Sequence, residues 1–399
     1  MLRVTLVKNL KNKYISMIED FLNPVDINQY HQISSLPKQI IGKNIKIYNK
    51  KEGLPDLKQF SIAIMGVFES RNSFYKMEKN DLNDFRSAFY SLYPGNWNIN
   101  IIDLGNLENG ETVEDTYSAL KEIIIFLQKF NVIPVILGGS HDLIYPAYRS
   151  FQSKKQLVNI VSVDRSYDFS QDEELISGRS YMSKIIMEQP NFLNNYTNIG
   201  YQNYYCAQEE KDLMDKLYFD SISLGDVLYD VKQVEPIFRD ADIVGFDMKC
   251  LSWQANGEIN STPNGIDSRT ICALSRYAGI SDKVSFLGLY ELGWSNSIFN
   301  QLLAQIVWYF IEGVQYRYNE FPVHINEGFI KYNVNLSDRE IVFYKSNMSQ
   351  RWWMELINDN ITNNKFKTST LLPCTEQDYE EAMKDKIPER WFNAIKRLH

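Results

Sequence analysis

Residues 160–169 read IVSVDRSYDF, and this apolar run followed by two aspartates is the starting point for predicting the fold. A short apolar run ends at Asp164, and a second aspartate, Asp168, follows four residues later. Such a run bounded by polar residues is typical of a buried strand, and carboxylates at the end of a strand often bind metal ions. No histidine lies between the two aspartates. Three interpretations therefore stay open: a metal site, a former metal site, or an ordinary strand end.

The same kind of apolar run recurs along the chain and predicts further strands. Strands are expected at 60–68, 98–105, 132–139, 157–164, 242–247 and 283–291. Apolar residues at helical spacing predict helices at 112–130 and 297–316, and a further helix is expected around Pro146. Strands that alternate with helices predict an α/β protein, and continuous apolar runs predict strands buried on both faces. We expect three α/β/α layers around a doubly wound, mainly parallel sheet.

Composition limits the classes of function. The chain has 399 residues, is 44% hydrophobic and carries a net charge of −8, which argues against nucleic acid as a partner. Its four cysteines form no CxxC pair, so buried reduced thiols in a cytoplasmic protein are expected. The N-terminus lacks the apolar core of a signal peptide, and no run approaches the ~20 apolar residues of a membrane span.

The last part of the chain differs in character from the rest. A boundary near Phe321 predicts a main domain over 1–321 and an aromatic-rich extension over 322–399, with the stretches VFYKSNMSQRWWMEL and IPERWFNAI. Two interpretations stay open for the extension. It packs on its own subunit, or its aromatic residues form an interface with a partner.

Polar residues follow four of the predicted strands. Ligands bind at the carboxyl ends of parallel strands, so these residues are expected to lie together. The four stretches are LGGSHD (137–142), VDRSYD (163–168), GFDMK (245–249) and LYELG (289–293). Their order and strand contexts resemble those of the ureohydrolase superfamily, which comprises arginase, agmatinase and formimidoylglutamase. The resemblance covers about residues 60–316, and GGSHD is most similar to the formimidoylglutamase form.

The resemblance implies a degenerate metal site. Members of this superfamily hold two manganese ions with six side chains. The ligands of one ion correspond to His141, Asp164, Asp168 and Asp247, which are all present. The second ion also needs a histidine and an acid at positions that Ser166 and Lys249 occupy here. One nitrogen and three carboxylate ligands suit Mn²⁺, so we expect either no ion or one Mn²⁺, and not two.

Lys249 is expected to replace the missing ion. Residues two apart on a strand point the same way, so Lys249 and Asp247 are both expected to enter the site. The ammonium would then neutralise part of the charge of the three aspartates, which is needed because buried uncompensated carboxylates are very unfavourable. Arg165 is expected to point to the opposite face from Asp164 and Ser166, unless the turn after the strand starts early. An exposed Lys249 without this role is the alternative.

Two further positions bear on activity by resemblance. The stretch SGRSYM (177–182) corresponds to a Ser-Gly-x-x-His-Gly motif, with Tyr181 in place of a histidine that serves in proton transfer. Glu291 corresponds to a glutamate near the cationic group of the substrate. It can recognise a guanidinium-like group, pair with Lys249, or match by chance. Asp168 and Glu291 remain the candidate catalytic residues.

The expected function follows from these losses. We expect a non-catalytic or strongly impaired ureohydrolase homologue, a pseudoenzyme with a binding or structural role. The alternative is a mononuclear hydrolase of a guanidino or formimino compound, with formimidoylglutamate as the leading substrate by resemblance. A small guanidino or formimino molecule is the expected ligand. The superfamily commonly forms trimers or hexamers, so a homo-oligomer is expected by resemblance.

Overall fold

The computed structural model describes residues 15–26, 35–73, 82–152, 156–170, 176–293, 296–320, 328–356 and 371–398. Its centre is a ten-stranded sheet with the order β1-β4-β3-β5-β10-β9-β6-β7-β8, in which β2 also pairs with β4. In chain order the strands are β1 (Leu22–Asn23), β2 (Lys46–Ile47), β3 (Ile62–Val67), β4 (Ile101–Leu107), β5 (Ile133–Leu137), β6 (Val158–Val163), β7 (Leu193–Tyr201), β8 (Asp220–Ser223), β9 (Ile243–Asp247) and β10 (Phe286–Tyr290). All pairings are parallel except that between β1 and β4, which confirms a mainly parallel sheet.

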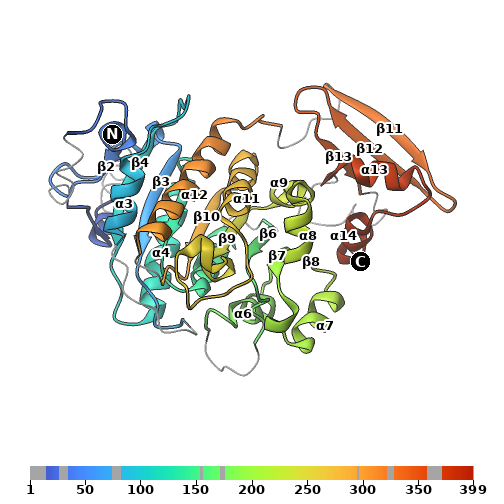
Figure 1. Ribbon diagram of the computed structural model, residues 1–399, viewed down its shortest axis with the longest axis horizontal. Helices are drawn as coiled ribbons and strands as arrows, with labels where there is room; N and C mark the ends of the chain where they lie inside the picture. Colours follow the sequence, from blue (N-terminus) through green and yellow to red (C-terminus); the bar gives the residue numbers. More distant parts are fainter. Residues whose placement is uncertain are drawn as a thin grey trace, which may run out of the picture.

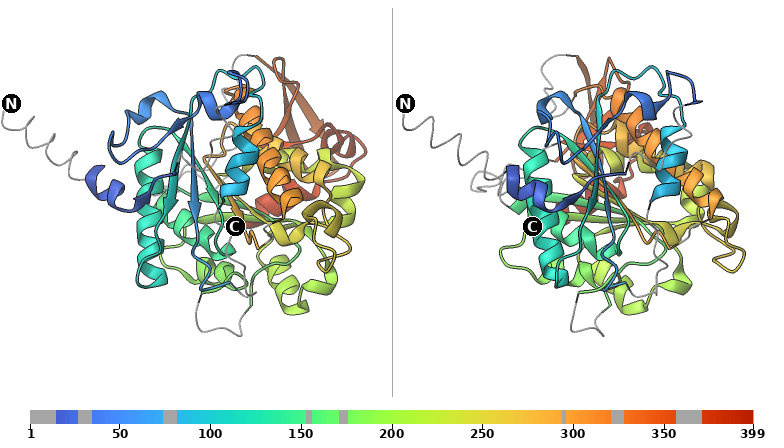
Figure 2. Two further views of the ribbon diagram at one scale, coloured as in Figure 1. Left: turned by 60° about the vertical axis from the view of Figure 1, so that its left-hand side comes forward. Right: turned by 90° about the vertical axis from the view of Figure 1, so that its left-hand side faces the viewer.

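Helices cover both faces of the sheet and complete three layers (Figures 1 and 2). The helices are α2 (Ile41–Asn44), α3 (Asn83–Tyr90), α4 (Val113–Gln128), α5 (Ile144–Gln152), α6 (Tyr181–Met187), α7 (Gln208–Lys216), α8 (Leu224–Tyr229), α9 (Glu235–Asp240), α10 (Trp253–Asn256), α11 (Ser268–Ile280) and α12 (Ser297–Gln315). One apolar core joins α3, α11 and α12 to the sheet, and a second joins α4, α5 and α6 to the opposite face.

The predicted elements form for the reasons that the sequence indicates. Every residue of β3, β5, β6, β9 and β10 is buried, as continuous apolar runs predict. Helix α4 begins with a capping box, in which Thr112 and Asp115 each accept a hydrogen bond from the other's backbone N–H. Helix α5 begins two residues before Pro146, where a proline costs no intrahelical hydrogen bond. Among the described residues, no helix is long and apolar enough to cross a membrane.

Helices α11 and α12 pack closely because glycines face each other between them. A Cβ atom on Gly279 would lie 2.2 Å from the carbonyl oxygen of Phe310 and 3.0 Å from the Cα of Gly313. We therefore expect Gly279→Ala to lower the free energy of unfolding by ~1–3 kcal/mol, since the two backbones must separate. Chemical denaturation measures this change.

A second glycine provides the control for this prediction. Gly225 lies in α8, and its nearest neighbour to an added Cβ is the Ser223 Oγ at 3.7 Å. Gly225→Ala is expected to leave stability unchanged or raise it by up to ~1 kcal/mol, because it reduces the entropy of the unfolded chain. A Gly279→Ala variant as stable as the unmodified protein would contradict the close contact.

The chain after α12 forms a separate antiparallel sheet, which we call the C-terminal module (residues 328–356 and 371–398). Its elements are β11 (Phe329–Asn335), β12 (Glu340–Ser346), β13 (Trp352–Glu355), β14 (Leu371–Cys374), α13 (Glu376–Ala382) and α14 (Glu389–Leu398). The module has its own apolar core between the sheet and its two helices. The boundary expected near Phe321 lies outside the described residues.

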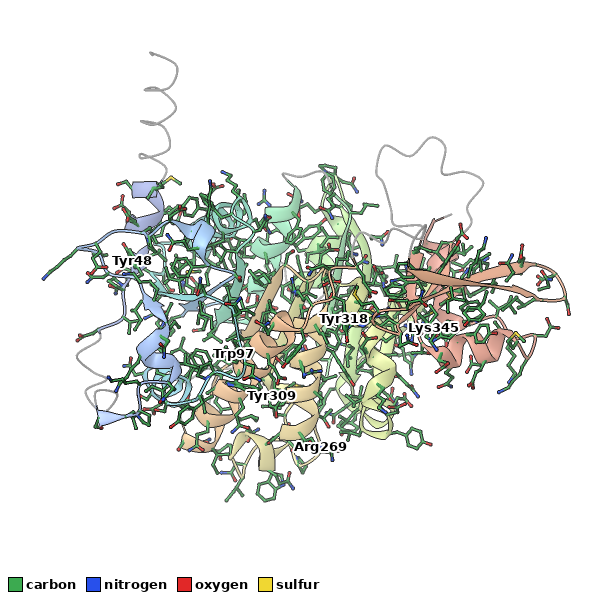
Figure 3. All side chains as sticks on the ribbon, turned by 90° about the horizontal axis from the view of Figure 1, so that it is seen from above. Tyr48, Trp97, Arg269, Tyr309, Tyr318 and Lys345 are labelled. Atoms are coloured by element: carbon green, nitrogen blue, oxygen red, sulfur yellow. The ribbon has the colours of Figure 1, made fainter. Side chains whose placement is uncertain are left out.

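The C-terminal module packs on its own chain, beside α9 and the edge strand β8 (Figure 1). The Arg239 guanidinium of α9 donates to the carbonyl oxygens of Trp352 and Cys374 at 3.1 and 2.8 Å. In the same contact, Arg351 pairs with Glu235 of α9 at 3.1 Å and packs over the ring of Tyr318, which Figure 3 places where the two parts meet. In this structure the extension therefore packs on its own chain, which is the first of the two interpretations given for it.

Candidate metal centre

Four adjacent strands carry the predicted polar residues to one edge of the sheet. The strands β5, β10, β9 and β6 are neighbours and run parallel. His141 begins a short 3₁₀ turn just after β5, and Asp164 directly follows β6. Asp247 is the last residue of β9, and Glu291 directly follows β10. These side chains therefore lie together at the carboxyl edge of the sheet, as expected for residues that follow parallel strands.

Glycines allow His141 to enter the site. Gly138 and Gly139 both have positive φ angles, 97° and 74°. A Cβ on Gly139 would lie 2.2 Å from the side chain of Leu143, so only glycine fits this turn. On β9, two strands away from β5, a Cβ on Gly245 would lie 2.2 Å from the side chain of Ile144 and 3.3 Å from Nε2 of His141, so the glycine leaves room for the start of α5 and for the imidazole ring.

The His141 Nδ1 atom faces the aspartates. It lies 3.1 Å from Asp168 Oδ2, 3.3 Å from Asp164 Oδ2 and 3.9 Å from Asp247 Oδ2. Nδ1 of His141, Oδ2 of Asp168 and Oδ2 of Asp164 are buried and have no hydrogen-bond partner among the described residues. Ligand atoms of His141, Asp164 and Asp247 all lie within 4.8 Å of one another. One nitrogen and several carboxylate oxygens that converge in this way fit a single Mn²⁺ ion.

The other edge of the imidazole is fixed by neutral groups. His141 Nε2 lies 3.3 Å from Ser162 Oγ and 3.4 Å from the Tyr181 hydroxyl. The ring packs between those of Tyr181 and Tyr290, at centroid distances of 4.8 and 5.4 Å. A hydroxyl partner at Nε2 leaves Nδ1 directed at the aspartates, the orientation in which a histidine binds a metal. Tyr181 stands where the family resemblance places a histidine, and its ring lies against that of His141.

The protonation of the cluster reflects its crowded acids. Burial lowers the pKa of His141, but the carboxylates of Asp164 and Asp168 outweigh burial and raise it well above the usual value. Burial, and then the charge of Asp164, raise the pKa of Asp168 well above the usual range. The same two causes raise the pKa of Asp247 to about 7. A cation within the cluster would relieve this repulsion.

Lys249 reaches the site, but not in the expected way. Strand β9 ends at Asp247, and Lys249 lies in the following 3₁₀ turn, so the alternation expected of a strand does not place it. Its backbone N–H donates to Asp247 Oδ1 at 2.7 Å, while its ammonium forms a close ion pair with Glu291 Oε2. Its head group lies against Glu291, which is one of the three alternatives expected for that glutamate, and its charge offsets part of the rise in the pKa of Asp247.

Glu291 is surrounded by donors. Besides Lys249, it accepts hydrogen bonds from Ser73 Oγ, at 2.9 Å to Oε2 and 3.1 Å to Oε1, and from the His141 backbone N–H at 3.3 Å. Glu291 and Asp168 both have positive φ angles, 58° and 61°. Such a backbone is strained for a glutamate and is common at functional sites.

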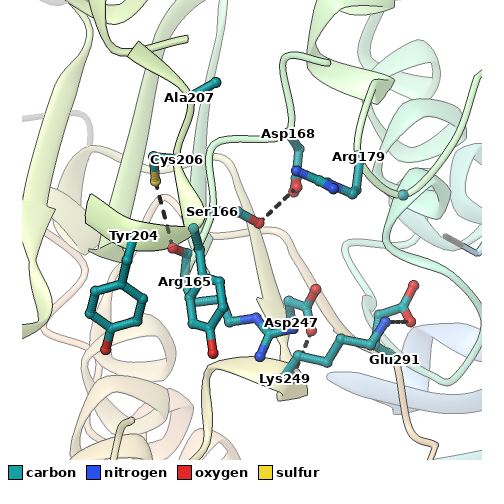
Figure 4. Close-up of a pocket in the computed structure, with 12 residues that line it drawn as sticks. Arg165, Ser166, Asp168, Arg179, Tyr204, Cys206, Ala207, Asp247, Lys249 and Glu291 are labelled. Carbon is teal, nitrogen blue, oxygen red and sulfur yellow. Dashed lines mark hydrogen bonds and ion pairs between the residues drawn. The ribbon is translucent and has the colours of Figure 1, made fainter. Parts of the chain in front are cut away.

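A pocket of about 360 Å³ opens over this cluster (Figure 4). Ser166 lies in its wall, with its Oγ 3.1 Å from Asp168 Oδ1 and 3.4 Å from Asp164 Oδ1. Arg165 also lines the pocket. The chain leaves β6 at Val163 and has already turned at Arg165, so the exception allowed for an early turn applies and Arg165 does not point away from the site.

Sequence reasoning missed two contributors to the site. Ser162 lies two residues before Asp164, so the alternation along β6 could have placed it beside His141. Ser73 lies 218 residues from Glu291 in the chain, and no local pattern identifies it. The remaining histidines, His31, His324 and His399, lie outside the described residues.

Comparisons with known proteins agree with this geometry. A model of the arginase family matches residues 65–291, more than half of the sequence, and the chain belongs to that family. The fold is that of the arginase/ureohydrolase superfamily and is formimidoylglutamase-like. No curated protein matches the sequence.

Solved structures show the same fold at low sequence identity. Formiminoglutamase from Trypanosoma cruzi, determined with Mn²⁺, is 14% identical with a TM-score of 0.61, over 70% of this chain and 99% of that one. Formimidoylglutamase from Bacillus subtilis is 13% identical with a TM-score of 0.61, over 70% and 92%. Agmatine ureohydrolase from Thermoplasma volcanium is 19% identical with a TM-score of 0.55, over 72% and 98%.

Proposed function

We propose that this chain is an arginase-family protein in which Lys249 occupies the place of a second metal ion, so that it holds at most one Mn²⁺. Such a protein has a binding or structural role in place of dinuclear hydrolysis. The ion pair between Lys249 and Glu291 is the observation that carries the proposal. An ammonium fixed beside the metal ligands repels a further cation, and position 166 offers a hydroxyl where an imidazole would be needed.

The single site is assigned to His141, Asp164, Asp168 and Asp247. Their converging atoms, including the buried Nδ1 of His141 and Oδ2 of Asp164, support this assignment. A Mn²⁺ ion bound there would supply a Lewis acid that lowers the pKa of a bound water. Ser162 and Tyr181 orient the imidazole, and Asp247 is held through its bond from the Lys249 backbone.

A second candidate function rests on the same complete ligand set. A mononuclear hydrolase of a guanidino or formimino compound would use the four ligands for its ion and Asp168 or Glu291 to handle a proton. The presence of all four side chains favours this candidate over a site without metal. The engagement of Glu291 by Lys249 disfavours it, because a cationic substrate would compete for the same carboxylate.

Metal content tests the proposal. Elemental analysis of protein purified from manganese-supplemented cells is expected to give at most one Mn²⁺ per chain. His141→Ala is expected to reduce any manganese to background, because the imidazole ligand assigned to the site is lost. Circular dichroism of that variant checks that it remains folded. Release of urea or formamide from a panel of guanidino and formimino compounds separates the two candidate functions, and two ions per chain would overturn the proposal.

A further inference from the structure

The charged side chains around the pocket form two groups. The basic residues are Arg165, Arg179 and Lys249, and the acidic residues are Asp168, Asp247 and Glu291. The pocket volume, about 360 Å³, falls in the range of sites for small molecules. Figure 4 shows Arg165, Asp247 and Lys249 on one side of the pocket and Arg179 near Asp168. The class of ligand then depends on which of these groups can contact it.

The acidic residues are turned to partners within the protein. The carboxylates of Asp168 and Asp247 face His141 Nδ1, at 3.1 and 3.9 Å. Glu291 is only 2% exposed and accepts from Lys249, from Ser73 and from the backbone of His141. A guanidinium or amidinium group that entered the pocket would have to displace Lys249 to obtain Glu291. Such a group would also meet the positive charge of the lysine itself.

Arg165 is held in a fixed orientation beside this pocket. Its Nη1 donates to Thr262 Oγ1 at 2.7 Å, and its guanidinium packs over the ring of Tyr205 at 4.4 Å. Its backbone carbonyl accepts from the N–H of Gln202 at 2.9 Å. A guanidinium that is positioned in this way loses little further entropy on binding, and its planar shape suits carboxylate and phosphate groups.

Lys249 adds a second positive charge at the floor of the pocket. Its side chain is 16% exposed, so it is reachable from the pocket although it pairs with Glu291. An ammonium has three N–H donors, so an ion pair on one side is compatible with an anion on another. Arg165 and Lys249 both present N–H donors and no acceptor at this pocket, and an oxyanion can accept from such donors whereas a guanidinium cannot.

We propose that this pocket binds its ligand through an oxyanion group, a carboxylate or a phosphate, held by Lys249 and Arg165. The inference rests on the proposed function and specifies its ligand class. The resemblance predicts a ligand whose guanidino or formimino group approaches the metal centre. In the ligand proposed here, a carboxylate or phosphate group takes that place. Of the two residues that carry the inference, Lys249 lies at a position where this sequence departs from the ligand pattern of the family.

Calorimetric titration of the full-length protein tests the ligand class. The probes are glutarate, inorganic phosphate and agmatine. Glutarate or phosphate is expected to bind, and whichever binds more tightly identifies the source of the oxyanion. Agmatine is expected to show no binding up to ~1 mM, a limit near −4 kcal/mol. Arg165→Gln is expected to weaken binding of the anion at least about tenfold, or 1.4 kcal/mol.

Two further variants make the test specific. Lys249→Met is expected to weaken anion binding by a similar factor, while Arg269→Gln, on the exposed side of α11, is expected to leave it unchanged. Preferred binding of agmatine, no binding of either anion, or an unchanged affinity in Arg165→Gln would each overturn the inference. Manganese is counted on the same samples. Two ions per chain would overturn the proposed function, whereas at most one ion with agmatine bound would overturn the ligand class alone.

Discussion

Replacing Ser166 with histidine and Lys249 with aspartate in one variant is expected to raise the manganese content from at most one ion to two per chain. The Ser166 Oγ lies 3.1 Å from Asp168 and 3.4 Å from Asp164, so an imidazole there would adjoin the existing ligands. An aspartate at 249 would remove the competing ammonium and supply a carboxylate next to Asp247. The result is a second set of nitrogen and oxygen ligands that suits Mn²⁺.

Binding of the second ion also predicts a change in stability. In the double variant, the carboxylate introduced at 249 would repel Glu291, which has lost its ammonium partner. The metal-free double variant is therefore expected to melt at a lower temperature than the unmodified protein. Added manganese is expected to reverse the loss, since a ligand at one hundred times its dissociation constant stabilises by ~2.7 kcal/mol. Elemental analysis and thermal unfolding with and without a chelator measure both effects.

Matched variants separate the added ligands from the removed side chains. Ser166→Ala with Lys249→Met removes the same two groups without adding a ligand, and it is expected to hold no second ion. Ser166→His alone keeps the ammonium against Glu291 and is also expected to hold none. If the double variant is folded yet gains no manganese, Ser166 and Lys249 do not occupy the place of a second ion.

The sequence predicted the site residues better than their contacts. Asp164, Asp247 and Glu291 could be placed because each ends an apolar run, and parallel strands bring such ends to one edge. Lys249 and Arg165 were predicted from strand alternation, which no longer applies once β9 and β6 have ended. The contact of Ser73 with Glu291 depends on the tertiary fold alone, because a loop after β3 brings it there.

The C-terminal module shows the same limit at a larger scale. Its aromatic residues marked it as a surface that packs against something, but composition does not identify the surface that covers it. That choice depends on long-range contacts such as the one between Arg239 and the carbonyls of β13 and β14. Division of the chain into a main domain and an extension remains a proposal, and the same arginine gives it a direct test.

Arg239→Met is expected to detach the C-terminal module from the main domain and to lower the free energy of unfolding by ~2–5 kcal/mol, mainly because the carbonyl oxygens of Trp352 and Cys374 lose their donor. Arg239 is 7% exposed, packs over the Trp353 ring at 4.7 Å and pairs with Glu235 at 3.0 Å. Methionine preserves most of the length but provides no donor, so two buried carbonyl oxygens lose their partners. Chemical denaturation measures the loss.

Hydrogen exchange locates the effect that Arg239→Met has on the molecule. Peptides that contain β13 and β14 are expected to exchange faster in this variant, while those from α12 are expected to keep their protection, because α12 packs in the core of the main domain. Arg239→Lys keeps the charge but cannot reach both carbonyls in the same geometry, so an intermediate effect is expected. Equal acceleration in α12 and β13 would mean that the chain unfolds as one unit, and the proposed division at the extension would then be wrong.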